Sequence, residues 1–379
     1  MVELTEKWCQ EKALHNAIHE SILILGNKDG SNKGLKSKGE IPKILSDALS
    51  VSFDPRVGHD YIEDYDKRFE FYHRVENKIP FDIDYFNTIT NGGLSPKTLT
   101  VILAGTNVGK SLVMCHFASA ALAQGYNVLY ITLEMAEEKI ASRIDANLLN
   151  IPLNTLMGLS KDIYDKKIER LKERVKGKLI IKEYPPASVN ANHFKHLLNE
   201  LHLKKQFKPD IIFVDYINLC TSSRIKPGNS AGMYAYVKAI AEELRGIAVE
   251  QRVPLVSATQ TNRSGYTNTD PGLEDTSESF GLPATADLMF ALVSPEELES
   301  LNQIMIKQLK NRDNDLRTSK RGIIGIDRSK MRLYNVVAEV PDAPTPQDLY
   351  KEVGKNKEQT SVYKSAKSSM EEKINEWNL

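Results

Sequence analysis

A glycine, a lysine and a serine stand together in the segment AGTNVGKS, residues 104–111, directly after the apolar run LTVIL. Apolar residues at helical spacing follow it. A strand, a loop and a helix in this order form a P-loop, in which backbone N–H groups surround phosphates, the lysine reaches the β- and γ-phosphates and the serine hydroxyl holds Mg²⁺. The sequence therefore predicts a site for Mg²⁺ and ATP or another nucleoside triphosphate, formed by Gly105, Thr106, Asn107, Val108, Gly109, Lys110, Ser111 and Leu112.

The first position of this loop departs from the consensus, because the chain has Ala104 where the P-loop pattern has glycine. A small side chain at this position still lets the backbone close on a phosphate. The alternative for an isolated Gly-Lys-Ser is a tight turn between a strand and a helix, capped by Ser111. The apolar run before the loop and the helical pattern after it favour the P-loop.

Polar residues also end three further apolar runs: Glu134 after VLYIT, Asp215 in IIFVD and Gln260 in PLVSATQ. Active residues of a parallel sheet lie at the carboxyl ends of its strands, so we expect these side chains near the P-loop. Glu134 would orient and deprotonate a water, Asp215 would support Mg²⁺ through its waters, and Gln260 would sense the γ-phosphate. The alternatives are a glutamate that complements a helix dipole and a turn residue at a strand end.

The elements that must position these residues are apolar runs separated by helical segments. Runs that are apolar throughout predict an α/β fold with a mostly parallel sheet and helices on both faces. Two later runs predict an antiparallel hairpin at the edge of the sheet. The runs expected in the sheet are 99–104, 128–132, 211–215, 254–260, 287–293 and 304–309, and those of the hairpin are 322–327 and 333–340.

The composition describes an ordinary globular protein, with 41% hydrophobic and 26% charged residues. Lys plus Arg and Asp plus Glu number 50 each, so a nucleic-acid partner would have to be held by a local basic surface. The three cysteines are far apart, without metal-ligand spacing, and predict buried thiols in a reducing compartment. Without a membrane span or a signal peptide in the sequence, we expect a cytoplasmic protein with no membrane partner.

Residues 1–25 predict an amphipathic linker or docking helix, because Leu14, Ile18, Ile22 and Leu25 fall on one face. A lone helix cannot bury this face, so we expect it to dock on the body of the chain or on another subunit. Residues 26–40 are rich in Gly, Lys and Ser and predict a flexible linker. We expect the ATPase domain in residues 41–340 and a polar C-terminal tail in residues 341–379.

Six segments, in this order and spacing, resemble the RecA-like motor domain of DnaB-family replicative helicases: AGTNVGKS, ITLEMAEEKIASRIDA, FVDYINL, SATQTNRS, SESFGLPATADLMF and IKQLKNRDND. The wording of LEMAEEKIASRIDAN and GLPATAD resembles in particular the helicases of T-even-type bacteriophages. The resemblance implies a RecA-like core behind a linker helix. It also implies an ATP-driven hexameric ring in the host cytoplasm, which translocates 5′–3′ on single-stranded DNA and unwinds the replication fork, with primase and a helicase loader as partners.

Carried over by position, the resemblance makes Lys110 and Ser111 ligands of phosphate and Mg²⁺, Glu134 the catalytic base, Asp215 the metal-supporting acid and Gln260 the coupling residue. Family members carry Ala or Gly at the first P-loop position, which accounts for the alanine here.

The family also places a Lys-x-Arg pair on a late strand that reaches the nucleotide of the neighbouring subunit. Lys310 and Arg312 match this pair, and the alternative is a basic, solvated strand end. An arginine supplied in trans would stabilise transition-state charge, so hydrolysis would depend on assembly.

DNA contacts in the family come from loops that face a central channel, and Ser277, Glu278 and Phe280 occupy the matching positions. Ser277 stands where an arginine is common, so part of the electrostatic grip must come from elsewhere. The segment TSSRIKPGNSAG offers Arg224 and Lys226 for this role. A few basic residues per subunit are enough in a ring, because the contacts multiply.

Family members usually carry a further N-terminal helical domain, and the sequence given starts close to the linker helix, so we expect a truncated chain or a naturally short protein. Two other functions remain open: a RecA-class recombinase and a nucleotide-switched DNA-binding ATPase. The opening helix with its linker, the GLPATAD segment and the Lys310/Arg312 pair favour a ring motor. A switch does not need a hydrolytic base, so Glu134 argues against that function.

Overall fold

The described chain, in a computed structural model, falls into two units, Met1–Val75 and Glu76–Leu379. The sequence placed the start of the ATPase domain at residue 41, and the structure divides the chain later because the helix after the linker packs on the first helix. The residues described are 2–26, 38–49, 51, 58–73, 76–226, 232–261, 272–273, 281–316 and 319–336.

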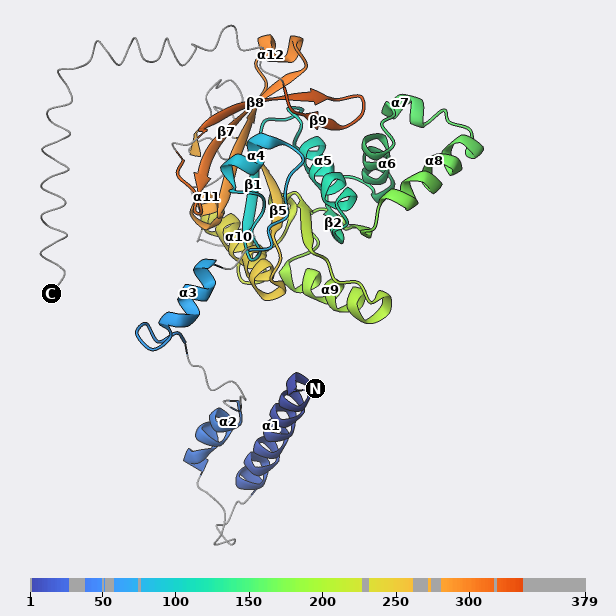
Figure 1. Ribbon diagram of the computed structural model, residues 1–379. Coiled ribbons are helices and arrows are strands. Elements are labelled where there is room, and N and C mark those ends of the chain that lie inside the picture. The colour runs from blue at the N-terminus through green and yellow to red at the C-terminus, as the bar shows by residue number, and fades with distance from the viewer. Residues whose placement is uncertain are drawn as a thin grey trace, which may run out of the picture. The chain divides into compact units, whose positions relative to one another are not determined.

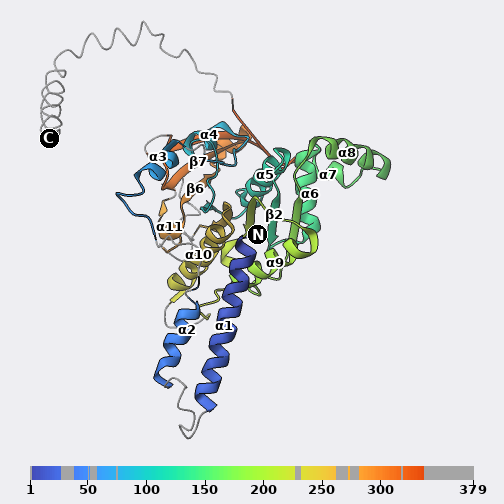
Figure 2. The same ribbon diagram turned by 60° about the horizontal axis from the view of Figure 1, so that its bottom comes forward.

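The N-terminal unit contains α1 (Val2–Gly26), the 3₁₀ turn η1 (Lys38–Glu40), α2 (Ile41–Leu49) and α3 (Tyr65–His73). In both ribbon views α1 and α2 run side by side (Figures 1 and 2). The buried residues of α1 are Ala17, Ser21 and Ile24, which share one face at helical spacing. The apolar face expected from the sequence is a different one, and its Ile18, Ile22 and Leu25 remain exposed in this unit.

The described strands of the second unit form one nine-stranded sheet in the order β3-β2-β4-β5-β1-β6-β7-β8-β9. Neighbours from β3 to β6 are parallel, and those from β6 to β9 are antiparallel. The strands are β1 (Leu99–Ala104), β2 (Val128–Thr132), β3 (Leu179–Glu183), β4 (Ile211–Asp215), β5 (Leu255–Gln260), β6 (Leu288–Val293), β7 (Gln303–Asn311), β8 (Arg321–Asp327) and β9 (Arg332–Tyr334).

This sheet confirms the predicted fold class and corrects two details. The run 304–309, expected among the parallel strands, lies in β7 and is antiparallel to β6. Strand β3 was not expected from the sequence. The predicted edge hairpin is formed by β8 and β9, and residues 337–340 of its second run lie outside the described residues.

Helices cover both faces of the sheet (Figure 1). One layer packs Phe86, Phe117 and Phe290 between the sheet and α4, α5 and α6, and the other packs the sheet against α9 and α10. Every residue of β1 is buried, because its side chains alternate between two covered faces. The helices are α4 (Asp84–Ile89), α5 (Lys110–Ala123), α6 (Glu137–Leu148), α7 (Leu153–Leu156), α8 (Lys161–Arg174), α9 (Ala191–Lys205), η2 (Ile217–Leu219), α10 (Gly232–Gln251), α11 (Gly281–Thr285) and α12 (Glu296–Ser300).

The strand register gives the sheet two functionally different edges. Ala104 pairs with Gln260, and Thr132 pairs with Asp215, so the predicted site residues meet at the carboxyl ends of the parallel strands. Because β7 runs antiparallel, its Asn311 pairs with Leu288 of β6 at the opposite, amino edge of the sheet. Among the described residues, none of the helices is both long and apolar enough to cross a membrane.

Candidate nucleotide-binding site

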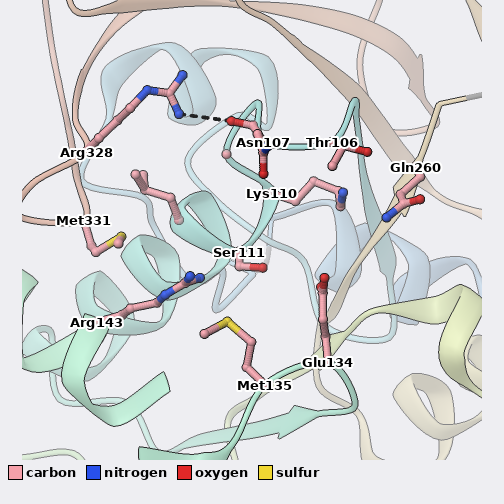
Figure 3. Close-up of a pocket in the computed structure, with 12 residues that line it drawn as sticks. Thr106, Asn107, Lys110, Ser111, Glu134, Met135, Arg143, Gln260, Arg328 and Met331 are labelled. Carbon is pink, nitrogen blue, oxygen red and sulfur yellow. Dashed lines mark hydrogen bonds between the residues drawn. The ribbon is translucent and has the colours of Figure 1, made fainter. Parts of the chain in front are cut away.

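The P-loop and the neighbouring strand ends line a cavity of about 270 Å³ (Figure 3). It contains predicted residues from the P-loop, from the segment after β2 and from the end of β5, together with residues that the sequence did not single out. The lining residues are Thr106, Asn107, Gly109, Lys110, Ser111, Leu112, Glu134, Met135, Arg143, Gln260, Arg328 and Met331.

The shape of the P-loop depends on two residues with left-handed backbone. Asn107 has φ 63° and Gly109 has φ 128°. At Gly109 an added Cβ would find its nearest neighbour 3.7 Å away, so the backbone conformation, and not space, calls for glycine. Helix α5 begins at the next residue, Lys110, and its N-terminus is directed at the loop.

Lys110 is a buried cation, with 8% of its surface exposed. Burial lowers the pKa of Lys110, while the negative charges of Glu134 and Asp215 oppose this shift. Its Nζ lies 5.5 Å from the centre of the Tyr216 ring. A phosphate group in the cavity would supply a close counter-charge for this ammonium group.

Asp215 is fully buried, with 0% exposure, at the end of β4. The hydroxyl of Tyr130 donates to its Oδ2 over 2.8 Å, whereas its Oδ1 is buried with no hydrogen-bond partner. Burial raises the pKa of Asp215, and the hydrogen bond from Tyr130 opposes this. Ser111 lies beside the carboxylate, so an oxygen acceptor and a hydroxyl fit a hydrated Mg²⁺ at this place.

Glu134 lies on the segment between β2 and α6, and Figure 3 shows it pointing toward Lys110. Helix α6 has Ala136 as its N-cap, and its first turn already contains Glu137 and Glu138. Glu134 is therefore outside the helix, which leaves less support for a role in complementing the helix dipole. Its role as a base stays a prediction.

Gln260 donates from Nε2 to the Tyr216 hydroxyl over 3.2 Å. The preceding Thr259 donates to Asn218 Oδ1 over 2.8 Å, in the 3₁₀ turn η2 that Tyr216 begins. Tyr216 thus lies between the P-loop lysine and the glutamine at the end of β5. The sequence reasoning missed it, although it directly follows Asp215 in the segment FVDYINL.

Arg143, Arg328 and Met331 are further cavity residues that the sequence reasoning missed. Arg328 donates from Nη1 to the carbonyl oxygens of Asn107 and Val108, each over 3.3 Å (Figure 3). It comes from the turn between β8 and β9, and no local pattern predicts that this turn folds back onto the P-loop.

The structure describes only part of the predicted DNA-contacting set. Ser277, Glu278 and Phe280 lie outside the described residues. Arg224 contacts α10, where it pairs with Glu242 over 2.7 Å and donates to a backbone carbonyl over 3.0 Å. Lys226 is exposed.

Lys310 and Arg312 do not line the cavity at the P-loop of their own chain. They follow the register of β7 to the amino edge of the sheet, where Arg312 pairs with Asp287 over 2.8 Å. The structure therefore separates the predicted pair from the other predicted site residues of the same chain.

The sheet, the P-loop and the residues at its strand ends define a P-loop NTPase with a RecA-like core. The model of the DnaB-like helicase C-terminal domain matches residues 79–325, and the chain belongs to the DnaB-like helicase family. It is accordingly an ATP-dependent replicative DNA helicase of the DnaB type, as the sequence predicted.

Two relatives show how far this likeness extends. The chain is 42% identical over 352 residues to the DnaB-like replicative helicase of Enterobacteria phage T4, covering 91% of this chain and 74% of that protein. It is 27% identical over 205 residues to the replicative DNA helicase DnaB of Helicobacter pylori, covering 53% of this chain and 40% of that protein.

Two solved structures share the fold. The ATPase domain of a DnaB-like helicase has a TM-score of 0.59 at 18% identity, over 74% of this chain and all of that one. A DnaB-like replicative helicase, described with its interactions with primase, has a TM-score of 0.61 at 17% identity, over 88% of this chain and 78% of that one.

Proposed function

We propose that this chain assembles into a homo-oligomeric ring, a hexamer, that hydrolyses ATP with Mg²⁺ and translocates 5′–3′ on single-stranded DNA in the cytoplasm of a host cell. The observation that carries the proposal is the distribution of functional groups between two edges of one sheet. The P-loop, Glu134 and Asp215 lie at the carboxyl edge, and Arg312 lies at the amino edge. Each chain would thus contribute to two different sites.

In this proposal the residues of one chain bind and activate the nucleotide. Lys110 and the N-terminus of α5 neutralise charge on the β- and γ-phosphates. Mg²⁺, when bound, neutralises charge on the phosphate oxygens, and Ser111 and Asp215 would hold it, the carboxylate through a water. Glu134 orients the attacking water and accepts its proton. The neighbouring subunit supplies Arg312 and Lys310, which stabilise the charge of the transition state.

Gln260 would report the presence of the γ-phosphate to the DNA-facing segments. Its contact with Tyr216 leads to η2 and from there to the segment with Arg224 and Lys226. With Ser277, Glu278 and Phe280, these residues would hold the strand mainly through its phosphates. Primase and a helicase loader are the proposed protein partners.

Mixed rings of two inactive variants test the proposal. Arg312→Ala subunits should bind ATP through their own P-loop yet fail to hydrolyse it, whereas Glu134→Gln subunits lack the base and still lend their arginine. In co-assembled rings some interfaces combine an intact Glu134 with an intact Arg312, and these should regain DNA-stimulated ATPase activity.

The outcome separates three interpretations of Arg312. Near-normal ATPase activity of Arg312→Ala alone would mean that Arg312 is only a solvated charge. An inactive single variant without recovery on mixing would place its effect in its own chain. Both results contradict the role in trans.

A further inference from the structure

One carboxylate collects the hydrogen bonds of two arginines at the amino edge of the sheet. Asp287, with 6% of its side chain exposed, accepts from Arg245 Nε over 2.9 Å and from Arg245 Nη2 over 3.1 Å. It also accepts from Arg312 Nη1 over 2.8 Å and from the backbone N–H of Leu99 over 3.0 Å. The first residue of β1 and the guanidinium of Arg312 therefore share one anchor.

The last residues of α11 hold the same pair of cations from the other side. Lys310 Nζ donates to the carbonyl oxygens of Pro283 and Ala284 over 2.6 and 2.9 Å. Arg312 Nη2 donates to the Ala284 carbonyl over 2.9 Å. Helix α11 follows directly in sequence on residues 277–280, the segment proposed to face DNA.

The anchored arginine still has donors to offer. Its side chain is 42% exposed, and a guanidinium carries five N–H groups, of which the contacts above use two. A cavity of about 560 Å³ opens beside it, lined by Arg245, Arg312, Ala284 and Glu250 among others. Three cations, Arg245, Lys310 and Arg312, surround the single carboxylate of Asp287, so the local charge favours an incoming anion.

We propose that Asp287 is a positioning residue for the trans-acting arginine, and that α11 transmits the position of the DNA-facing segment to Lys310 and Arg312. The inference rests on the proposed function of Arg312. Asp287 fixes the plane of the guanidinium, and the carbonyl oxygens of Pro283 and Ala284 fix its place relative to α11. A bound strand that orders the segment before α11 thereby sets the pair toward the nucleotide of the neighbouring subunit.

Asp287→Asn is a selective way to test this role. The remaining amide oxygen can still accept from the N–H of Leu99, so the start of β1 keeps its partner. The amide NH₂ group would face the arginines and cannot accept from Arg312. Loss of a hydrogen bond between charged groups predicts a fall in the DNA-stimulated ATPase rate of about tenfold or more. The ratio of DNA-stimulated to basal activity should fall too, while the Kd for ATP stays unchanged.

Glu250→Gln is the matched control. This glutamate lines the same cavity and pairs with Lys195 over 2.7 Å, so the variant removes one negative charge there without touching Arg312. It should keep the wild-type ratio of stimulated to basal activity. An equal loss in Glu250→Gln would attribute the effect to the general charge of the cavity and overturn the proposal.

Mixing with Glu134→Gln subunits distinguishes positioning from a structural role. Asp287→Asn chains retain their own P-loop and base, so an intact Arg312 from a Glu134→Gln neighbour should restore DNA-stimulated ATPase activity. If Asp287 mattered only for the folding of its own chain, no activity would return, and the proposal would be overturned. A wild-type ATPase rate and stimulation ratio for Asp287→Asn alone would overturn it as well.

Arg312→Ala, measured in parallel, keeps this inference separate from the proposed function. An active Arg312→Ala variant contradicts the role in trans itself. An inactive, rescuable Arg312→Ala variant beside a fully active Asp287→Asn variant contradicts only the positioning by Asp287.

Discussion

Replacement of Glu134 by glutamine removes a proton acceptor from the nucleotide cavity while leaving the size of the side chain unchanged. Glu134 is exposed to the cavity and lies outside α6, so its loss costs no described helix contact. General-base contributions are typically a factor of 100 or more, and we expect kcat for ATP to fall by roughly 100-fold, or about 2.7 kcal/mol in the barrier.

The same substitution should leave nucleotide binding intact. Burial raises the pKa of Asp215, and the negative charge of Glu134 adds to this shift, so the neutral glutamine relieves repulsion on this carboxylate. Burial lowers the pKa of Lys110, and Glu134 opposes that shift, so the lysine loses some support. The two effects act in opposite directions on a bound triphosphate, and we expect a Kd for ATP close to that of the wild type.

Single-turnover ATP hydrolysis and a separate binding titration measure the two quantities. Glu137→Gln is the control: Glu137 lies three residues further along, begins α6 and accepts from the backbone N–H of Glu183 over 2.8 Å. Hydrolysis by Glu134→Gln at the wild-type rate would refute the base assignment. A loss of the same size in Glu137→Gln would show that the geometry of this segment, and not a proton acceptor, limits the rate.

The remaining predictions concern binding, assembly and coupling. Lys110→Ala should weaken ATP binding by about tenfold or more. Because burial lowers the pKa of Lys110 below 10.5 and bound phosphates would raise it, binding should take up protons and weaken as the pH rises toward that value; calorimetry in two buffers measures this, and equal heats at alkaline pH would contradict it. Deletion of residues 1–25, which removes α1 with its exposed Ile18 and Ile22, should lower the mass of the oligomer in sedimentation, and an unchanged mass would contradict a role in assembly. Tyr216→Phe, which removes the acceptor of Gln260, should reduce DNA stimulation more than basal ATPase activity, and an unchanged ratio would contradict this coupling.

The central strands were predictable because both of their faces are covered. Such strands read as continuous apolar runs, and β1, β2, β4, β5 and β6 lie where those runs predicted them. Strand β3 is an edge strand that pairs only with β2, and its residues are partly exposed and end in Lys182 and Glu183. Its pattern is correspondingly weak, and the sequence reasoning passed over it.

The direction of β7 is not written in its own apolar run. The connection from Val293 to Gln303 holds only nine residues, with the short α12 within it, whereas a parallel crossover needs about a dozen or more. Chain length could therefore have predicted the antiparallel pairing, and with it the place of Lys310 and Arg312 at the opposite edge.

The predicted site residues that meet in the cavity share one property: each lies on the P-loop or follows a parallel strand. A strand register brings such residues together, so their convergence follows from the fold class. Arg143 comes from the middle of α6 and Arg328 from a hairpin turn. Their contribution depends on tertiary packing, which a single sequence does not encode in any local pattern.

Strand β1 connects the two edges of the sheet that the proposed function needs. Its first residue donates to Asp287, the anchor of Arg312, and its last residue begins the P-loop. Six residues of extended chain span about 20 Å at roughly 3.3 Å each, which is longer than an arginine side chain. An arginine anchored at Asp287 therefore cannot serve the P-loop of its own chain. If Arg312 completes a catalytic site, that site must belong to another subunit, and the fully buried β1 is the rigid element that holds the lent arginine and the borrowed one at a fixed distance.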